Sequence, residues 1–206
     1  MDTKMKSVLG SVLVIGIVAA MMTAGTQSWY SDTETSVGNT FTAGTLDLEI
    51  WDSGSGAWID DPEVPTVNDL WNNMVNNLKP GDSGTIVIPV KNAGTIDGYA
   101  DIHIMNVVNN PGVTTEPEPI PDNGELGSAI LVNISYDSDG DGVADETLVS
   151  QETLDNLECI PYTASTVLAG GSTANWIIDL WLPGTVGNEI QGDSVTCDIE
   201  FSLDQA

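Results

Sequence analysis

Alternation of apolar and polar residues is the main pattern of the chain from residue 45 onward. In Thr45–Trp51 apolar side chains take every second position, and in Thr85–Lys91 the residues Ile86, Ile88 and Val90 do the same. A period of two places successive side chains on opposite faces of a strand, so one face of each segment is predicted to be buried. The same pattern predicts strands at Tyr99–Val107, Ala129–Tyr136, Val143–Val149, Thr163–Leu168, Ala174–Leu182 and Val195–Leu203.

Turn-forming residues separate these segments. Lys79-Pro80-Gly81-Asp82, Asn92-Ala93-Gly94 and Ala169-Gly170-Gly171 each stand between two predicted strands. Many short strands with turns at this spacing are typical of antiparallel sandwiches and jelly rolls. We therefore predict an all-β fold, an antiparallel jelly-roll-like β-sandwich in one domain over residues 44–206.

Two segments break the alternation and are predicted to be short helices. In Thr66–Leu78 the apolar residues recur at helical spacing, which indicates an amphipathic helix. Ser150–Leu157 is the second candidate, with Ser150 as its N-cap. Between the strands, Asn110–Gly127 contains four prolines and four acidic residues and is expected to be an exposed loop.

The first 28 residues have the pattern of a secretory signal. Lys4 and Lys6 precede the apolar run from Val8 to about Met22, and small residues follow as far as Ser28. We expect residues 1–28 to be a signal peptide with an N-terminal helix, so that the protein is secreted and meets the membrane only during export. An uncleaved membrane anchor is the alternative, because the run is long enough to span a bilayer.

The charge of the chain is strongly negative. It has 31 acidic residues against 4 Lys and no Arg, a formal net charge of −27, which becomes −28 once residues 1–28 are removed. No nucleic acid is expected as a partner, because neutralising phosphates requires a basic face. A hydrophobic content of 41% with 6 Trp also excludes a disordered acidic tail. Cations and further copies of the chain are the expected partners.

An acidic turn between two predicted strands resembles a calcium-binding loop. Carboxylates stand at positions 1, 3, 5 and 9 of such a loop, and Gly142 stands at position 6, where the turn is sharp. Position 12 is Leu148, so the usual bidentate Glu is absent. We expect a structural Ca²⁺ site, the alternative being a metal-free acidic hairpin. The predicted ligands are Asp137, Asp139, Asp141, Val143 and Asp145.

The remaining candidate chemistry is sparse. Export makes a disulfide between Cys159 and Cys197 reasonable, with two free thiols as the alternative. Asn133 begins an N-glycosylation sequon, although it lies within a predicted strand. His103 is the single histidine and cannot form a typical zinc site of two or three histidines. No catalytic residue is predicted, and we expect the protein not to be an enzyme.

The segment after the predicted signal closely resembles the start of the mature proteins of the TasA/camelysin family. The resemblance lies in residues 29–36 (WYSDTETS) and 39–48 (NTFTAGTLDL). It continues more loosely in residues 77–82 (NLKPGD), residues 90–95 (VKNAGT) and several blocks after residue 180. The acidic loop, the insert at 110–127 and the cysteine pair depart from the family pattern.

The resemblance implies a jelly-roll-like subunit of extracellular fibres, such as biofilm matrix fibres and archaeal bundling pili, exported through a SipW-type signal peptidase. In such fibres the N-terminal segment, here residues 29–43, leaves its own domain and completes the sheet of the next subunit. Partners would then be copies of the same chain in a head-to-tail homopolymer. The residues expected to carry the donor strand are Trp29, Tyr30, Ser31, Asp32, Val37 and Phe41.

Three functions therefore remain open. The first is a secreted structural subunit that polymerises by donor-strand complementation and is stabilised by Ca²⁺. The second is a secreted metallo-endopeptidase, because camelysin carries that label within the resembled family. The third is a monomeric calcium-stabilised surface or adhesion module held by an uncleaved anchor. For residues 29–43 themselves, the alternative to a donor strand is a flexible tail.

Overall fold

The structure is a computed structural model that describes residues 43–60, 78–112 and 122–206. These residues belong to one compact unit, Ala43–Ala206. The predicted signal peptide, the donor segment except Ala43, and the predicted helix Thr66–Leu78 except Leu78 lie outside the described residues. Within the described part of the chain, no helix is long and apolar enough to cross a membrane.

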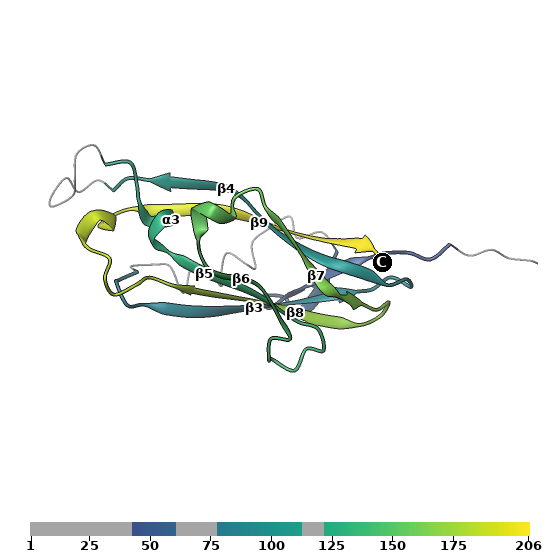
Figure 1. The fold of residues 1–206 in the computed structure, drawn as a ribbon. Helices are drawn as coiled ribbons and strands as arrows, with labels where there is room; N and C mark the ends of the chain where they lie inside the picture. Colours follow the sequence, from purple (N-terminus) through teal and green to yellow (C-terminus); the bar gives the residue numbers. More distant parts are fainter. Residues whose placement is uncertain (1–42, 61–77, 113–121) are drawn as a thin grey trace, which may run out of the picture. The chain divides into compact units, whose positions relative to one another are not determined.

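Two antiparallel sheets form the described part of the fold (Figure 1). The larger has the strand order β2-β1-β3-β8-β5-β6 and the smaller has the order β7-β4-β9. The predicted all-β antiparallel sandwich is therefore confirmed. The strands are β1 (Leu48–Asp52), β2 (Ala57–Ile59), β3 (Ser83–Asn92), β4 (Gly98–Asn110), β5 (Leu131–Asp137), β6 (Glu146–Thr153), β7 (Pro161–Leu168), β8 (Thr173–Trp181) and β9 (Ser194–Gln205).

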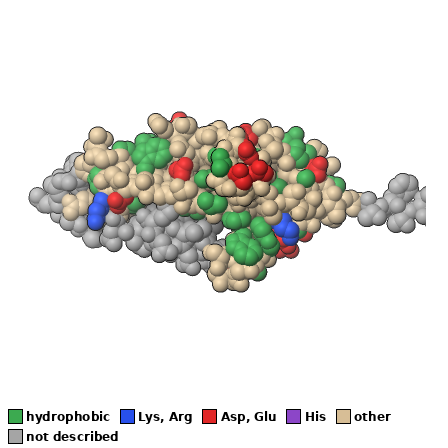
Figure 2. All heavy atoms as spheres, turned by 90° about the horizontal axis from the view of Figure 1, so that it is seen from below, with side chains coloured by type: hydrophobic (Ala, Val, Ile, Leu, Met, Phe, Trp, Pro, Cys, Tyr) green, Lys and Arg blue, Asp and Glu red, His purple; other side chains and the backbone are tan. Residues whose placement is uncertain are grey.

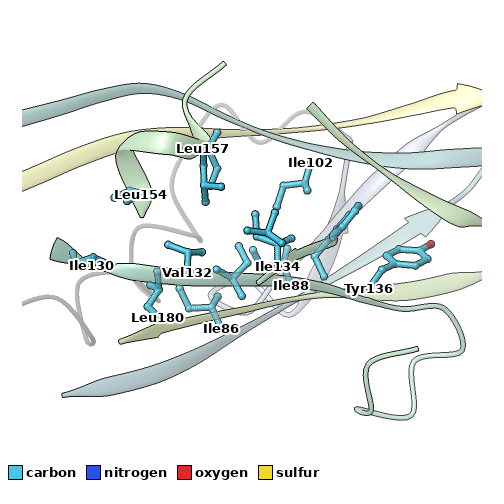
Figure 3. Packing of buried hydrophobic residues seen from close by; sticks show 14 of the residues in the cluster. Ile86, Ile88, Ile102, Ile130, Val132, Ile134, Tyr136, Leu154, Leu157 and Leu180 are labelled. Atoms are coloured by element: carbon cyan, nitrogen blue, oxygen red, sulfur yellow. The ribbon is translucent and has the colours of Figure 1, made fainter. Parts of the chain in front are cut away.

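The core lies between the two sheets and uses the faces that the alternation predicted. On β3, Ile86, Ile88 and Val90 are buried, and on β4 the same holds for Ala100, Ile102 and Ile104. Figure 3 shows how side chains from both sheets meet in this layer, with β5 supplying part of it. The period of two thus identifies the inner face of β3 and of the first half of β4.

The predicted helix Ser150–Leu157 is wrong over its first half. Strand β6 continues to Thr153, and only Leu154–Leu157 forms a short 3-10 helix, η1. The strand pairs with β5 beyond a bulge, as far as Thr153 opposite Leu131. At the bulge Gln151 has a positive φ, and its backbone N–H donates to Asn133 Oδ1 (2.9 Å). Leu154 and Leu157 are buried, which explains the apolar spacing that resembled a helix.

Smaller differences concern the ends of elements. Strand β2 was not predicted, and its Trp58 stacks edge-on against Trp51 of β1 with ring centroids 5.4 Å apart. β6 begins at Glu146, so Val143 lies in the preceding loop with 65% of its surface exposed. The predicted loop 110–127 overlaps a one-turn helix, α3 (Leu126–Ala129), while η2 (Asn188–Ile190) is the second 3-10 turn.

The two lateral sides of the sandwich differ. On one side β6 is joined to β7, because Glu146 Oε2 accepts hydrogen bonds from the backbone N–H (2.8 Å) and hydroxyl (2.9 Å) of Ser165. On the other side β1 and β9 border a hollow. One side of the sandwich is therefore closed by hydrogen bonds, while the other is open in the described part of the chain.

Candidate functional site: an open groove and an acidic loop

The open side contains a groove of about 460 Å³ between β1 and β9. One wall is formed by β1 and the residues just before it, and the other by β9. The apolar lining residues are Leu46, Leu48 and Ile50 on the first wall and Ile199, Phe201 and Leu203 on the second. The β9 residues alternate along the strand, are half-buried and pack against the core. A groove with apolar positions at a period of two matches the side-chain spacing of an added β-strand.

The outer edge of β9 carries no ladder partner among the described residues. Its inner edge pairs with β4 over the full length of the strand, from Gly98 opposite Gln205 to Asn110 opposite Ser194. A 12-residue edge strand leaves a row of backbone N–H and C=O groups available for pairing with another chain. The groove and this edge adjoin, so one strand could satisfy both.

The described chain starts, at residues 43–45, beside one end of this groove. The backbone N–H of Thr45 donates to Thr95 Oγ1 (3.0 Å), and the N–H of Thr95 donates to the Thr45 carbonyl (2.8 Å). Thr95 lies just before the start of β4, which pairs with the end of β9. The described chain therefore begins at the end of the sandwich where β9 finishes.

Acidic residues line the groove together with the apolar ones. Asp47, Asp60 and Glu200 contribute to its wall, and neither Lys79 nor Lys91 does. A side-chain hydrogen bond with Asp60 raises the pKa of Asp47, and burial and the negative charges of Asp60 and Glu49 act in the same direction. The rim is thus negatively charged, which favours an occupant with few acidic residues or a cation beside it.

The acidic loop between β5 and β6 is organised around Asp137, whose side chain is fully buried. Asp137 Oδ1 accepts the backbone N–H of Gly140 (2.8 Å), and its Oδ2 accepts the N–H of Gly142 (2.9 Å) and the Asn175 amide (2.8 Å). Burial alone would raise the pKa of Asp137, but the bonds from Asn175, Gly142, Gly140 and Asp141 outweigh it and lower that pKa. The carboxylate is therefore held ionised.

Three of the five predicted ligands come together. Asp137, Asp139 and Asp145 each place a carboxylate oxygen within 4.8 Å of the others. Asp141 is not part of this group, and its Oδ1 accepts the Val143 backbone N–H (2.8 Å). Figure 2 shows one compact cluster of acidic side chains on the face in view, with other acidic side chains scattered around it. Such a set of oxygen ligands suits a hard cation such as Ca²⁺.

A second group of three carboxylates was not predicted from the sequence. Asp122, Glu125 and Asp193 also place oxygens within 4.8 Å of one another, and all three are half-buried. Asp193 ties distant segments together, because it accepts the backbone N–H groups of Gly112 (3.0 Å) and Glu125 (2.7 Å). No spacing motif links residues 71 positions apart, so only the fold reveals this group.

The predicted disulfide between Cys159 and Cys197 is not formed, and both thiols are free in the structure. Cys197 lies on β9, whereas the backbone N–H of Cys159 donates to the Ile104 carbonyl on the opposite edge of β4 (2.9 Å). Because β4 runs between them, the two Cα atoms are separated by about two strand spacings, roughly 10 Å. A disulfide requires less than about 7 Å.

Asn133 and His103 occupy strand positions without obvious chemistry. Asn133 lies in the middle of β5, between two neighbouring strands, and its Oδ1 accepts the Gln151 N–H. This is not the surface loop in which glycosylated asparagines are usually found. His103 lies on β4 and belongs to neither carboxylate group, so the described residues bring no histidine to a metal cluster.

These features define an all-β sandwich with one open side and an acidic loop. A family model for the camelysin metallo-endopeptidases matches residues 4–176, and the chain therefore belongs to the camelysin family, as its resemblance to TasA/camelysin proteins predicted. The matched range ends within β8, so β9 lies beyond it. A search of curated proteins finds no match.

Proposed function

We propose that this protein is a secreted structural subunit that polymerises by donor-strand complementation into extracellular filaments. The main support for this proposal is the open groove between β1 and β9, whose wall has apolar side chains at every second position of β9. The outer edge of β9 has no strand partner in the described part of the chain. Membership of the camelysin family supports the extracellular location, because its members are typically extracellular or attached to the cell surface.

The donor segment has the composition that such a groove requires. Residues 29–43 contain no proline and are rich in Thr and Ser, which favours an extended strand. Trp29, Val37 and Phe41 fall on one alternate face, and Glu34 falls on the other with the polar residues. A strand inserted between β1 and β9 would cover half-buried apolar side chains and satisfy backbone groups of β9.

Negative-stain microscopy on two purified chains tests this proposal. One chain starts at Trp29 and the other at Gly44, and each is examined with and without calcium. We expect fibres from the longer chain and monomers from the shorter one, which lacks the donor segment. Monomers from both chains at every salt concentration would refute polymerisation and favour the monomeric adhesion module instead.

A pair of point variants tests whether one face of residues 29–43 is inserted into the groove, or whether any added charge in this segment prevents fibre formation. Phe41→Asp places a charge on the face expected to enter the groove, and should abolish fibres without changing the thermal midpoint of the monomer. Thr40→Asp adds the same charge on the opposite face and should leave fibre formation largely intact. Equal loss of fibres in both variants would argue against one buried face.

We also infer that the acidic loop binds Ca²⁺ as a structural ion, with Asp137, Asp139 and Asp145 as the protein ligands. The support is the convergence of these three carboxylates and the fixed loop geometry around Asp137. The uncompensated repulsion among carboxylates at this distance would be relieved by a divalent cation. The ion would hold the β5–β6 turn and would not take part in catalysis.

Metallo-endopeptidase activity is the second candidate, because the family description names it. Both carboxylate groups found in the described residues consist of Asp and Glu alone, which suits calcium better than catalytic zinc. A chelator-sensitive protease assay on the purified chain decides between the two functions. Cleavage of an unfolded protein substrate that zinc restores after chelation would favour the peptidase.

A further inference from the structure

The direction in which a strand would lie along β9 follows from where the chain leaves the domain. We name the two ends of the sandwich by their residues: the Thr95 end contains Thr95 and Gln205, and the Lys79 end contains Lys79 and Ser194. Lys79 and the residues just before Ser194 line one common hollow, which places them together. Strand β9 therefore runs from the Lys79 end to the Thr95 end.

The described chain begins at the Thr95 end, because Thr45 is hydrogen-bonded to Thr95 there, so the segment 29–43 is joined to the domain at this end. If this segment folded back into the groove of its own domain, residue 43 would lie at the Thr95 end and residue 29 toward the Lys79 end. Read from N- to C-terminus, such a strand runs in the same direction as β9. Self-complementation is thus a parallel pairing.

A segment donated by a neighbour has two possible directions with different assemblies. If it lies parallel to β9, its residue 43 again reaches the Thr95 end, so the Thr95 ends of both copies meet. Each copy then fills the groove of the other, and a closed two-fold dimer results. If it lies antiparallel, the Thr95 end of the donor meets the Lys79 end of the acceptor, and the contact repeats without closing.

We infer that the filament contact is an antiparallel pairing between β9 of one copy and residues 29–43 of the next, with the Thr95 end of each copy against the Lys79 end of its neighbour. This inference rests on the proposed function and adds the polarity of the filament. Every strand pair in the described sheets is antiparallel, and antiparallel ladders are slightly more stable per residue than parallel ones.

The same geometry makes the parallel, self-filled groove the competing state. A chain whose own segment occupies its groove has no free β9 edge to offer, so it is inactive in assembly. Conversion to the filament requires the segment to leave the groove and reverse its direction relative to the β9 that it pairs with. Strand direction therefore distinguishes the assembling form from the self-complemented monomer and from the closed dimer.

Engineered disulfides test whether residues 29–43 of one copy lie parallel or antiparallel to β9 of the next. In a chain starting at Trp29 with Cys159→Ser and Cys197→Ala, Thr40→Cys is combined with a cysteine at the Lys79 end of β9, either Thr196→Cys or Asp198→Cys. The matched control combines Thr40→Cys with Ser202→Cys, near the Thr95 end. Each protein is assembled, oxidised and analysed by non-reducing electrophoresis, with circular dichroism confirming that each variant is folded.

We expect a ladder of covalent multimers from Thr40→Cys with Thr196→Cys or Asp198→Cys, and loss of that ladder with Ser202→Cys. Cross-linking with Ser202→Cys instead, as a monomer or a dimer, would overturn the inference while leaving donor-strand exchange possible. Fibres without cross-linking in any pair would overturn β9 as the acceptor. Absence of fibres from the parent chain would refute the proposed function itself.

Discussion

At the scale of single residues, Asp101 is an acidic side chain whose buried environment opposes its charge. It lies on β4, is only 6% exposed, and accepts a hydrogen bond from the Thr163 hydroxyl through Oδ1, while Oδ2 has no partner. Burial raises the pKa of Asp101, the Thr163 bond opposes the rise and Asp204 adds to it. The surroundings of Asp101 therefore disfavour its charged form, and one of its buried oxygens has no hydrogen-bond partner.

Replacing this charge should stabilise the fold. We expect Asp101→Asn to raise the free energy of unfolding by about 1–2 kcal/mol at pH 7, because the buried group no longer has to ionise. The folded pKa is raised, so the destabilising charge is lost as the pH falls through it. The gain, measured by thermal or urea unfolding, should therefore shrink toward pH 4.

A control on the neighbouring strand tests whether burial is the cause. Glu200→Gln removes the same charge from an exposed position on β9 and relieves only the general repulsion of an acidic chain. Its effect on the thermal midpoint should be smaller and should vary less with pH. Equal stabilisation by the two variants would assign the effect to net charge and not to the buried site.

The two cysteines should react at very different rates. Cys159 is exposed, whereas burial, with the charge of Asp198 beside it, raises the pKa of Cys197 to about 11. Since the thiolate is the reactive form, Cys197 should resist alkylation at pH 7.5 while Cys159 is labelled. Peptide mapping by mass spectrometry measures both. If neither residue is labelled in denaturant until a reductant is added, the cysteines are paired in the isolated protein.

At the scale of elements, the β5–β6 loop offers two acids that differ in one respect. Asp139 belongs to the converging carboxylate group, and Asp141 does not, although both are exposed in the same turn. Calcium at about 100 times its Kd should stabilise the wild type by about 2.7 kcal/mol. Asp139→Asn should lose most of this gain and Asp141→Asn should keep most of it, as measured by thermal unfolding with calcium or a chelator.

A similar calcium response in both variants would show that the three converging carboxylates do not define the site. Magnesium serves as the ion control, because its smaller size demands near-octahedral geometry that a flexible acidic turn seldom provides. A shift of equal size with magnesium at the same ionic strength would indicate screening of the loop charges and not a bound ion.

The sequence predicts the long strands well and the short elements poorly, for physical reasons. A period of two identifies β3 and β4 because one face of each is buried along most of its length. The helix predicted for residues 150–157 was wrong in its first half. A bulge at Gln151 followed by a 3-10 turn buries Leu154 and Leu157 at a spacing that resembles that of a helix. Local patterns do not encode the hydrogen bond that the Gln151 N–H at this bulge donates to the side chain of Asn133, 18 residues earlier.

The candidate site was predictable only in part. The spacing of Asp137, Asp139 and Asp145 identifies the acidic loop, but nothing in it shows that Asp141 turns its carboxylate to the Val143 N–H. The groove requires the fold, because it joins Leu46–Ile50 to a strand some 150 residues later. Long-range pairing decides which strand is left at an edge, and periodicity carries no information about that.

At the scale of the whole molecule, net charge should control assembly. In the proposed filament, a charge near −28 on each chain without residues 1–28 would make subunits repel one another over about 10 Å at 0.1 M salt and about 3 Å at 1 M. We expect light scattering to show faster assembly as sodium chloride increases. Calcium chloride at matched ionic strength should act more strongly if the loop site contributes. Assembly that is unchanged by salt and chelator would refute the role of charge.

The position of the Thr45–Thr95 hydrogen bonds has a mechanical consequence. Tension along a filament would enter each subunit through its N-terminal segment at the Thr95 end and leave through the strand held against β9 at the Lys79 end. Donor strand and β9 would then be pulled in opposite directions along their length. Their hydrogen bonds would be loaded together in shear instead of being peeled apart one by one, so a polymer held by non-covalent pairing could resist extension.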